Sequence, residues 1–268
     1  MLLAIDVGNT QTVVGLFRGG ELADHWRLAT DASRTSDELA LMIQQFLGFH
    51  GFAVQPSGGV ALDDDPDAVR VSGVVVSSVV PRVTAALREL SERYFALPPV
   101  VLEPGTRTGM PILYDNPKEV GADRIANAVG AFDLYGGPTL VVDFGTATTV
   151  EAITARGEYL GGAIFPGIEV SLDALFERAA GLRRVELVAP RSVIGRSTAE
   201  SIQSGAVYGF AGQVDALVER FQAEVGEPCT VVATGGLAPL VVPHTRTVSN
   251  IEPWLTLRGL RIVFERNR

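Results

Sequence analysis

The sequence predicts an α/β fold built from two similar halves, each with a mixed sheet. The first observation is a repeat: residues 3–13 match residues 140–150, which lie 137 positions later, without a gap. In both copies an apolar run leads into Asp-x-Gly and then into several threonines. The second observation is that the same offset pairs Gly20-Glu21 with Gly157-Glu158, where a hairpin turn is expected. Strand triplets followed by helices, twice over, are typical of two related α/β domains, which we place at 1–117 and 118–268.

The composition describes an ordinary soluble globular protein. The chain has 268 residues, of which 47% are hydrophobic and 20% charged, enough for two domains of common size. The net charge of −9 weighs against a large nucleic-acid surface. The single cysteine, Cys229, excludes an internal disulfide and fits a reducing compartment, and we expect it in the core. Since we find neither a signal peptide nor an apolar run of membrane-spanning length, we expect a cytoplasmic protein without membrane or nucleic-acid partners.

The first half contains five apolar or β-branched runs. These runs predict strands at residues 2–7, 12–17, 22–28, 71–80 and 99–102. Helical spacing of apolar residues predicts one helix from the N-cap at Thr35-Ser36-Asp37 and another from Pro81. Residues 55–70 are rich in Gly, Pro and Asp and predict a surface loop. Its acidic cluster at 63–67 is compatible with a metal site, although a solvated loop is the simpler interpretation.

The second half repeats the opening strands. Its apolar runs predict strands at residues 139–143, 149–155, 158–164 and 230–233. Helices are expected at residues 118–135, after 168, and at 197–221. In the last of these, Ser201, Gly205 and Gly209 recur every four residues, a spacing that permits close helix packing. The tail from Arg258 is expected to be a strand or a helix end.

The repeated stretch has the chemistry of a phosphate-binding loop. Asp6 and Asp143 each end an apolar strand, so each delivers a carboxylate to the sheet edge, where it can hold a cation. Gly8 and Gly145 permit a tight turn and close approach of a ligand to the backbone. Hydroxyls and exposed amides that suit phosphate oxygens come from Thr10, Thr12, Thr146, Thr148 and Thr149. An ordinary strand-end turn would explain one copy, but two matching copies favour loops that grip the phosphates of ATP from both sides of a nucleotide cleft between the domains.

A phosphoryl transferase also needs a group that orients or deprotonates the acceptor hydroxyl. Asp123 is the candidate, because it lies early in an expected helix, where the helix N-terminus favours an ionised carboxylate. A helix-start residue with a surface partner is the competing interpretation, and Arg124 can equally be part of a surface ion pair. Thr234-Gly235-Gly236 after a strand permits close approach of a nucleotide, but a plain turn explains it as well.

Four motifs in one order and spacing carry a family resemblance. They are Asp6-Val7-Gly8-Asn9-Thr10, the run from Asn116 to Arg124, the run from Asp143 to Thr149, and the run from Gly161 to Gly167. With these motifs the chain resembles, from end to end, the type III pantothenate kinases, which catalyse the first step of coenzyme A synthesis. That family belongs to the acetate and sugar kinase, actin-like superfamily, so the resemblance implies a duplicated actin-like fold.

The resemblance also implies the site residues. ATP, with Mg²⁺, would contact Asp6, Val7, Gly8, Asn9, Thr10, Gln11, Thr12, Val13 and Thr146. Pantothenate would contact Tyr114, Gly121, Ala122, Asp123, Arg124 and Thr198. Asp123 would accept the proton of the primary hydroxyl of pantothenate, giving 4'-phosphopantothenate, and Asp143 would bind a monovalent cation, K⁺ or NH₄⁺. The family forms a homodimer whose substrate site lies close to the partner subunit.

Two departures and two alternative functions remain open at this point. Ser197 precedes Thr198 where the family commonly has Asn, and the 55–70 loop is longer than usual. One alternative is a catalytically weak relative that acts as a regulatory accessory protein. The other is a kinase for a different small hydroxy compound, which would keep the ATP loops and change the acceptor contacts at Tyr114, Arg124 and Thr198.

Overall fold

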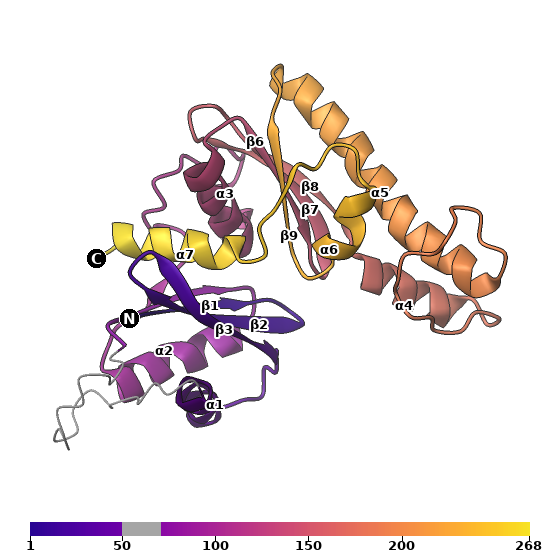
Figure 1. The fold of residues 1–268 in the computed structure, drawn as a ribbon. Helices are drawn as coiled ribbons and strands as arrows, with labels where there is room; N and C mark the ends of the chain where they lie inside the picture. Colours follow the sequence, from indigo (N-terminus) through magenta and orange to yellow (C-terminus); the bar gives the residue numbers. More distant parts are fainter. Residues whose placement is uncertain (50–70) are drawn as a thin grey trace. The chain divides into compact units, whose positions relative to one another are not determined.

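The computed structural model describes residues 1–49 and 71–268, and the expected loop at 55–70 lies outside them (Figure 1). Within the described residues the chain forms two five-stranded mixed sheets. By contacts it divides into two compact units that interleave along the sequence. Unit 1 comprises residues 1–109, 116–130 and 256–268, and unit 2 comprises residues 110–115 and 131–255. This division differs in kind from the two sequence halves, 1–117 and 118–268, which stay a prediction.

The sheet of unit 1 has the order β3-β2-β1-β4-β5. Its strands are β1 (Leu2–Val7), β2 (Gln11–Arg18), β3 (Glu21–Ala29), β4 (Gly73–Ser78) and β5 (Val100–Val101). β1 pairs antiparallel with β2 and parallel with β4. Both β1 and β4 are buried along nearly their whole length, as expected of central strands covered on both faces.

Two helices cover one face of this sheet, α1 (Ser36–Phe49) and α2 (Pro81–Phe95) (Figure 1). A reciprocal capping box starts α1: the Thr35 backbone N–H donates to Glu38 Oε2 at 2.8 Å, and the Glu38 N–H donates to Thr35 Oγ1 at 3.3 Å. α2 begins with proline at its first position and ends at Ala96 in the left-handed conformation. Their apolar faces join alternate residues of β1 and β2 in one core.

The sheet of unit 2 has the order β10-β9-β6-β7-β8. Its strands are β6 (Thr139–Phe144), β7 (Ala147–Ile153), β8 (Tyr159–Pro166), β9 (Thr230–Thr234) and β10 (Asn250–Ile251). β6 pairs antiparallel with β7 and parallel with β9. Replacing each strand by its counterpart turns one sheet order into the other, so the predicted duplication of an α/β fold with mixed sheets is confirmed.

The two copies differ by one residue in the turn after the repeated Asp-x-Gly. In sheet 1 Asp6 pairs with Val13, whereas in sheet 2 Asp143 pairs with Thr149. Accordingly the Gly8 N–H donates to the carbonyl of Gln11, and the Gly145 N–H donates to that of Ala147, one residue nearer. The 137-residue offset therefore holds for the first strand and the Asp-x-Gly, but not for the paired positions of the strand that follows.

Unit 2 carries α4 (Ile168–Arg178), the 28-residue α5 (Thr198–Val225) and the short α6 (Ala238–Val241). Ser197 caps α5 by accepting a hydrogen bond from the Glu200 N–H at 3.2 Å. One face of α5, including Phe210, packs in the core of the second sheet. Even with this long helix, no helix in the described part of the chain is long and apolar enough to cross a membrane.

The small residues on α5 do not face a neighbouring helix within the described residues. Ser201, Gly205 and Gly209 are exposed, and a Cβ added at either glycine would meet nothing within 4 Å. The close packing expected from their spacing is therefore not made within residues 1–49 and 71–268.

Two helices from later in the chain contribute to unit 1. They are α3 (Ala122–Tyr135), whose residues up to Gly130 belong to it, and α7 (Leu255–Arg266), which belongs to it from Thr256 on. Within unit 1, α7 packs closely against β4: a Cβ at Gly73 would lie 2.1 Å from the Phe264 ring. Contact with α3 is closer still, since a Cβ at Gly259 would lie 1.8 Å from the Ala126 carbonyl oxygen. The C-terminal tail, expected as a strand or helix end, is thus a helix that completes the first unit.

Several expected boundaries were wrong. The helix predicted at 118–135 begins only at Ala122, because Val120 has an extended backbone after a separate 3₁₀ turn at Pro117–Glu119. The strand predicted at 71–80 is limited to Gly73–Ser78. Cys229 lies directly before β9 and is half-buried against the core rather than inside it, and burial raises the pKa of its thiol.

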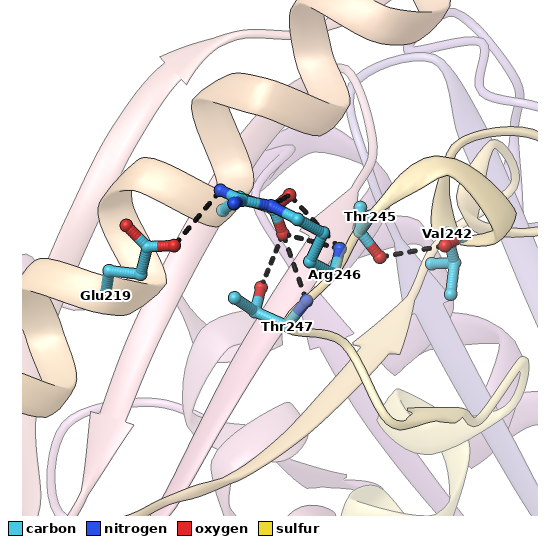
Figure 2. Close-up of polar contacts among 6 residues, drawn as sticks. Glu219, Val242, Thr245, Arg246 and Thr247 are labelled. Carbon is cyan, nitrogen blue, oxygen red and sulfur yellow. Dashed lines mark hydrogen bonds and ion pairs between the residues drawn. The ribbon is translucent and has the colours of Figure 1, made fainter.

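One buried carboxylate fastens the chain after the 3₁₀ turn Val242–His244 to α5 (Figure 2). Asp215 on α5 accepts hydrogen bonds from the backbone N–H groups of Arg246 and Thr247 and from the Thr247 hydroxyl, at 2.8–3.1 Å. Arg246 reaches over the same helix to Glu219 at 3.1 Å. Burial raises the pKa of Asp215, but the hydrogen bonds from Thr247 and Arg246 outweigh it, so the net pKa lies below its ordinary value.

Candidate functional site

The first Asp-x-Gly loop leaves β1 at the edge of sheet 1. Asp6 is half-buried, while Asn9, Thr10 and Gln11 are exposed in the turn. The turn is closed by the Gly8–Gln11 hydrogen bond at 3.0 Å and tied to the neighbouring strand by the Thr30 N–H, which donates to the Thr10 carbonyl at 2.9 Å. A fixed turn with exposed amides and hydroxyls is the arrangement expected of a phosphate-binding loop.

The second loop surrounds Asp143 with glycines. Asp143 pairs with Thr234 of β9, and the next residue, Gly235, has a φ of +93°. A Cβ at Gly235 would lie 2.6 Å from Asp143 Oδ1 and equally close to the Phe144 carbonyl oxygen. Only glycine permits this conformation and this approach without strain. Thr234-Gly235 thus belongs to the second loop, and the plain-turn interpretation misses this contact.

The N-terminus of α4 is fixed to the same loop. The Gly167 N–H donates to the Thr146 carbonyl at 3.1 Å, and a Cβ at Gly167 would lie 2.5 Å from the Gly145 carbonyl oxygen. The motif from Gly161 to Gly167 therefore supports the loop that contains Gly145 and Thr146, which are both exposed.

The threonines of the two loops have different environments. Thr10 and Thr146 are exposed, and Thr149 lies opposite Asp143 on the same face of sheet 2. Thr12 is buried, with its hydroxyl 2.8 Å from that of Thr30. Thr148 lies opposite Phe144, whose side chain is part of the core, and its buried hydroxyl has no hydrogen-bond partner among the described residues. Exposure therefore makes Thr10 and Thr146 the accessible hydroxyls.

Asp123 is the second residue of α3, two positions after Gly121, the glycine that precedes the helix. Its Oδ1 accepts a hydrogen bond from the Arg124 backbone N–H at 2.9 Å. The first helical hydrogen bond runs from the Ile125 N–H to the Gly121 carbonyl, at 3.1 Å. A Cβ at Gly121 would lie 2.5 Å from Asp123 Oδ1, so glycine leaves room for the carboxylate. Asp123 is half-buried and Arg124 buried, which favours a site over an exposed surface pair.

Tyr114 belongs to unit 2 and rests on β8. The segment 110–115 pairs with Tyr159: the Leu113 N–H donates to the Tyr159 carbonyl at 2.8 Å, and the Tyr159 N–H donates to the Pro111 carbonyl at 2.9 Å. The Tyr114 ring lies 6.5 Å from the Tyr159 ring and against Gly161, where a Cβ would come within 3.3 Å. Thr198 is separate from this contact and is exposed at the start of α5.

The predicted residues fall into two groups. Unit 1 contains the loop from Asp6 to Val13 and the helix start from Gly121 to Arg124, and unit 2 contains Tyr114, Asp143, Thr146 and Thr198. Sequence reasoning missed Ser77, which is fully buried and lies opposite Asp6 in the parallel register with β4. A serine inside the apolar run of β4 was the available signal.

The donor chemistry at Asp143 fits a hard cation. The carboxylate, the neighbouring Phe144 carbonyl and the space that a Cβ at Gly235 would fill supply oxygen ligands and room. Among the described residues, no group of three or more His, Cys, Asp or Glu side chains is arranged to hold a metal.

Comparisons with known proteins relate the chain to one family. The profile of the type III pantothenate kinase family matches residues 2–220. A type III pantothenate kinase of Streptomyces griseus is 55% identical, covering 100% of this chain and 98% of that protein. Another, from a Parafrankia species, is 57% identical with the same coverage.

A solved structure supports the fold alone. A Baf family protein from Campylobacter jejuni superposes with a TM-score of 0.59 at 18% identity, covering 99% of this chain and 98% of that one. The fold is therefore the duplicated actin-like α/β fold. Because the profile covers most of the chain and both relatives match it over nearly their full length, the chain belongs to the type III pantothenate kinase family.

Proposed function

We propose that this protein transfers the γ-phosphoryl group of ATP to the primary hydroxyl of pantothenate, giving 4'-phosphopantothenate in the first step of coenzyme A synthesis. The observation that carries the proposal is the full-length similarity to proteins named type III pantothenate kinase. The position of Asp123 and the two Asp-x-Gly loops support the same reaction. In this reaction the hydroxyl oxygen forms a bond to the γ-phosphorus, the bond to the β,γ-bridging oxygen breaks, and ADP leaves.

The ATP side of the proposal uses both loops. The exposed turn from Gly8 to Gln11 and the exposed Thr146 offer amides and hydroxyls to phosphate oxygens. Asp6, Val7, Thr12 and Val13 belong to the strands that hold the first turn in place. When bound, Mg²⁺ would neutralise phosphate charge, and Asp6 is the carboxylate of unit 1 that the resemblance assigns to the nucleotide.

The acceptor side uses Asp123 as the base. Its carboxylate is held by the Arg124 N–H at the N-terminus of α3, where negative charge is favoured. It would take the proton of the pantothenate hydroxyl as that oxygen attacks. Gly121, Ala122, Arg124, Tyr114 and Thr198 complete the proposed contacts with pantothenate. Asp143 would hold a monovalent cation, K⁺ or NH₄⁺.

Exposed apolar side chains support a homodimer through unit 2. Of the twelve large hydrophobic side chains exposed in the described part of the chain, seven lie between residues 160 and 194. Two of them, Leu160 and Ile164, project from β8, which is an edge strand. Such an edge with apolar residues is suited to pairing with a second copy. With one half-buried cysteine, the protein suits a reducing cytoplasm.

The test is ATP-dependent phosphorylation of pantothenate by the purified protein, with Mg²⁺, in K⁺ and in Na⁺ buffer. We expect product in K⁺ or NH₄⁺ and much less in Na⁺. Asp123→Asn should lower kcat by roughly 10²- to 10⁴-fold, the usual contribution of a positioned base, while leaving ATP binding intact. Asp115→Asn is the matched control, because Asp115 is an exposed carboxylate in the segment of Tyr114 and should be near wild type. Absence of product in every buffer, with ATP bound, would contradict the assignment.

A further inference from the structure

Unit 2 contains a fully buried glutamate that the proposed reaction does not use. Glu151 lies in the middle of β7, between Val150 and Ala152, and its side chain is 0% exposed. Burying a carboxylate is costly unless hydrogen bonds compensate for the lost water. An apolar residue at this position would match its neighbours, so the contact that Glu151 makes calls for an explanation.

One partner of Glu151 is Tyr159 at the start of β8. The Tyr159 hydroxyl donates to Glu151 Oε2, and the tyrosine is also 0% exposed. A register shift in the β7–β8 pairing follows Ala152, so that Ile153 pairs with Tyr159. Bulges of this kind redirect side chains. The pair is therefore built by the irregular register rather than by an ordinary cross-strand position.

The pair lies on the same face of sheet 2 as Asp143. Alternation along β7 places Thr149, Glu151 and Ile153 on one face, opposite the core residues Val150 and Ala152. Paired residues share a face, so Asp143, opposite Thr149, and Tyr159, opposite Ile153, belong to it too. A line of polar side chains thus leads from the cation-binding carboxylate to Tyr159.

Tyr159 is in turn the support of Tyr114. Its backbone N–H and carbonyl both bind the segment 111–113, and its ring lies beside that of Tyr114. Gly161, with a φ of +135°, leaves the space that the Tyr114 ring occupies. The two backbone hydrogen bonds fix the position of segment 111–113 along β8. The Glu151–Tyr159 hydrogen bond fixes the orientation of the Tyr159 ring, which lies beside the Tyr114 ring.

We infer that Glu151 and Tyr159 are positioning residues for the acceptor substrate: the buried pair holds Tyr114 in the orientation that contacts the hydroxy acid, without touching that substrate itself. This rests on the proposed function, in which Tyr114 contacts pantothenate. Fully satisfied buried polar networks specify a single arrangement, whereas an apolar pair at these positions would leave the Tyr159 ring free to turn.

The first experiment is steady-state kinetics of Tyr159→Phe, which removes one hydroxyl. We expect the KM for pantothenate to rise about tenfold, with the KM for ATP nearly unchanged, because a small misplacement of a substrate contact is enough for such a loss. Tyr208→Phe is the control: its hydroxyl also bonds a neighbouring segment, the Pro190 carbonyl at 3.3 Å, but lies on α5. It should leave both KM values near wild type.

The second experiment separates positioning from a purely structural role. In a Tyr114→Ala background, Tyr159→Phe should change the pantothenate KM no further, because its effect acts through Tyr114. An equal rise in both backgrounds, an equal rise in the ATP KM, or no rise at all would overturn the inference. If no variant or wild type forms product, the proposed function fails, which is a separate result.

A variant that keeps the fold completes the test. Tyr159→Phe removes one hydrogen bond from the buried Glu151 carboxylate and so destabilises the protein. Glu151→Met with Tyr159→Phe removes both polar groups at similar volume, which is often neutral for stability. We expect this double variant to unfold within a few degrees of wild type and still to show the raised pantothenate KM. A double variant with wild-type KM values would refute the positioning role.

Discussion

The threonines of the two Asp-x-Gly loops are the same residue type, but their hydroxyls lie in different environments. The sequence places five of them near the expected phosphates, and the structure leaves the hydroxyls of Thr10 and Thr146 exposed while those of Thr12 and Thr148 are buried. Strand register decides which face each side chain takes, and a one-residue difference between the two turns is enough to reverse that face. At the residue scale, motif spacing identifies the loop but not which of its groups are available.

The buried carboxylate of Asp215 makes a pH-dependent contribution to the stability of the fold. Its folded-state pKa lies below the unfolded value, so its contribution to stability is present above the unfolded pKa and is lost as pH falls through the folded one. The affected window lies below about pH 4, the ordinary range of aspartate.

We therefore predict that Asp215→Asn lowers the free energy of unfolding at pH 7 by about 2 kcal/mol, the usual range for hydrogen bonds to a charged group. The deficit should shrink as the pH approaches 3, where the wild-type carboxylate loses its advantage. Urea unfolding at both pH values measures it. Glu219→Gln is the control, because Glu219 is exposed and its pairing with Arg246 contributes little. A deficit that is the same at both pH values would contradict this account.

Elements with strong patterns were predicted, whereas the short α6 and β10 were not. β1, β4 and β6 were expected because continuous apolar runs mark buried central strands. The four-residue α6 and the two-residue β10 have too few positions to show a period. The start of α3 was misplaced because the helical spacing of apolar residues continues through Val120. The backbone of Val120 is extended, and the spacing of apolar residues does not reveal this. The Glu151–Tyr159 pair was likewise hidden, since it depends on a shift in strand register.

The position of Asp123 at the start of α3 depends on the packing of α3 against α7. Gly259 is buried against the Ala126 carbonyl, and the Thr256 hydroxyl bonds Asn127 Oδ1 at 2.7 Å. We predict that Gly259→Ala separates the helices, lowering the free energy of unfolding by about 2–3 kcal/mol through overpacking, and lowering kcat by moving Asp123.

Thermal unfolding and turnover of Gly259→Ala test this prediction. Gly212→Ala on α5 is the matched control, since a Cβ there meets nothing within 4 Å and should stabilise the helix by roughly 0.5–1 kcal/mol. Equal effects of the two substitutions would show that helix propensity, rather than packing, decides the outcome.

At the scale of the whole molecule, association is the property most open to test. If β8 and the apolar residues after it form the dimer surface, the protein at micromolar concentration should sediment at twice the 28.4 kDa of one chain. Ile164→Glu should give a single chain, because a buried interface does not accept an unpaired carboxylate.

Leu41→Glu provides the control for that prediction. Leu41 is also exposed, at 56%, but lies on α1, far from β8 in the sequence. It should leave the sedimentation of the wild type unchanged. A wild-type protein that sediments as one chain would remove the dimer from the proposal, whereas the kinase reaction would stand or fall separately.

The interleaving of the two units along the sequence has a consequence for how the chain folds during its synthesis on the ribosome. Sheet 1 is synthesised before the sheet of unit 2. The twelve-residue helix α7, which packs against Gly73 and Ala126 of unit 1, is synthesised after both sheets. Domains usually fold during synthesis in the order in which they emerge. Here the first unit stays incomplete until α7 is released, so the nascent chain can finish its second unit before its first. The carboxylate of Asp123, the proposed base, is then among the last groups to be fixed, although it lies near the middle of the sequence.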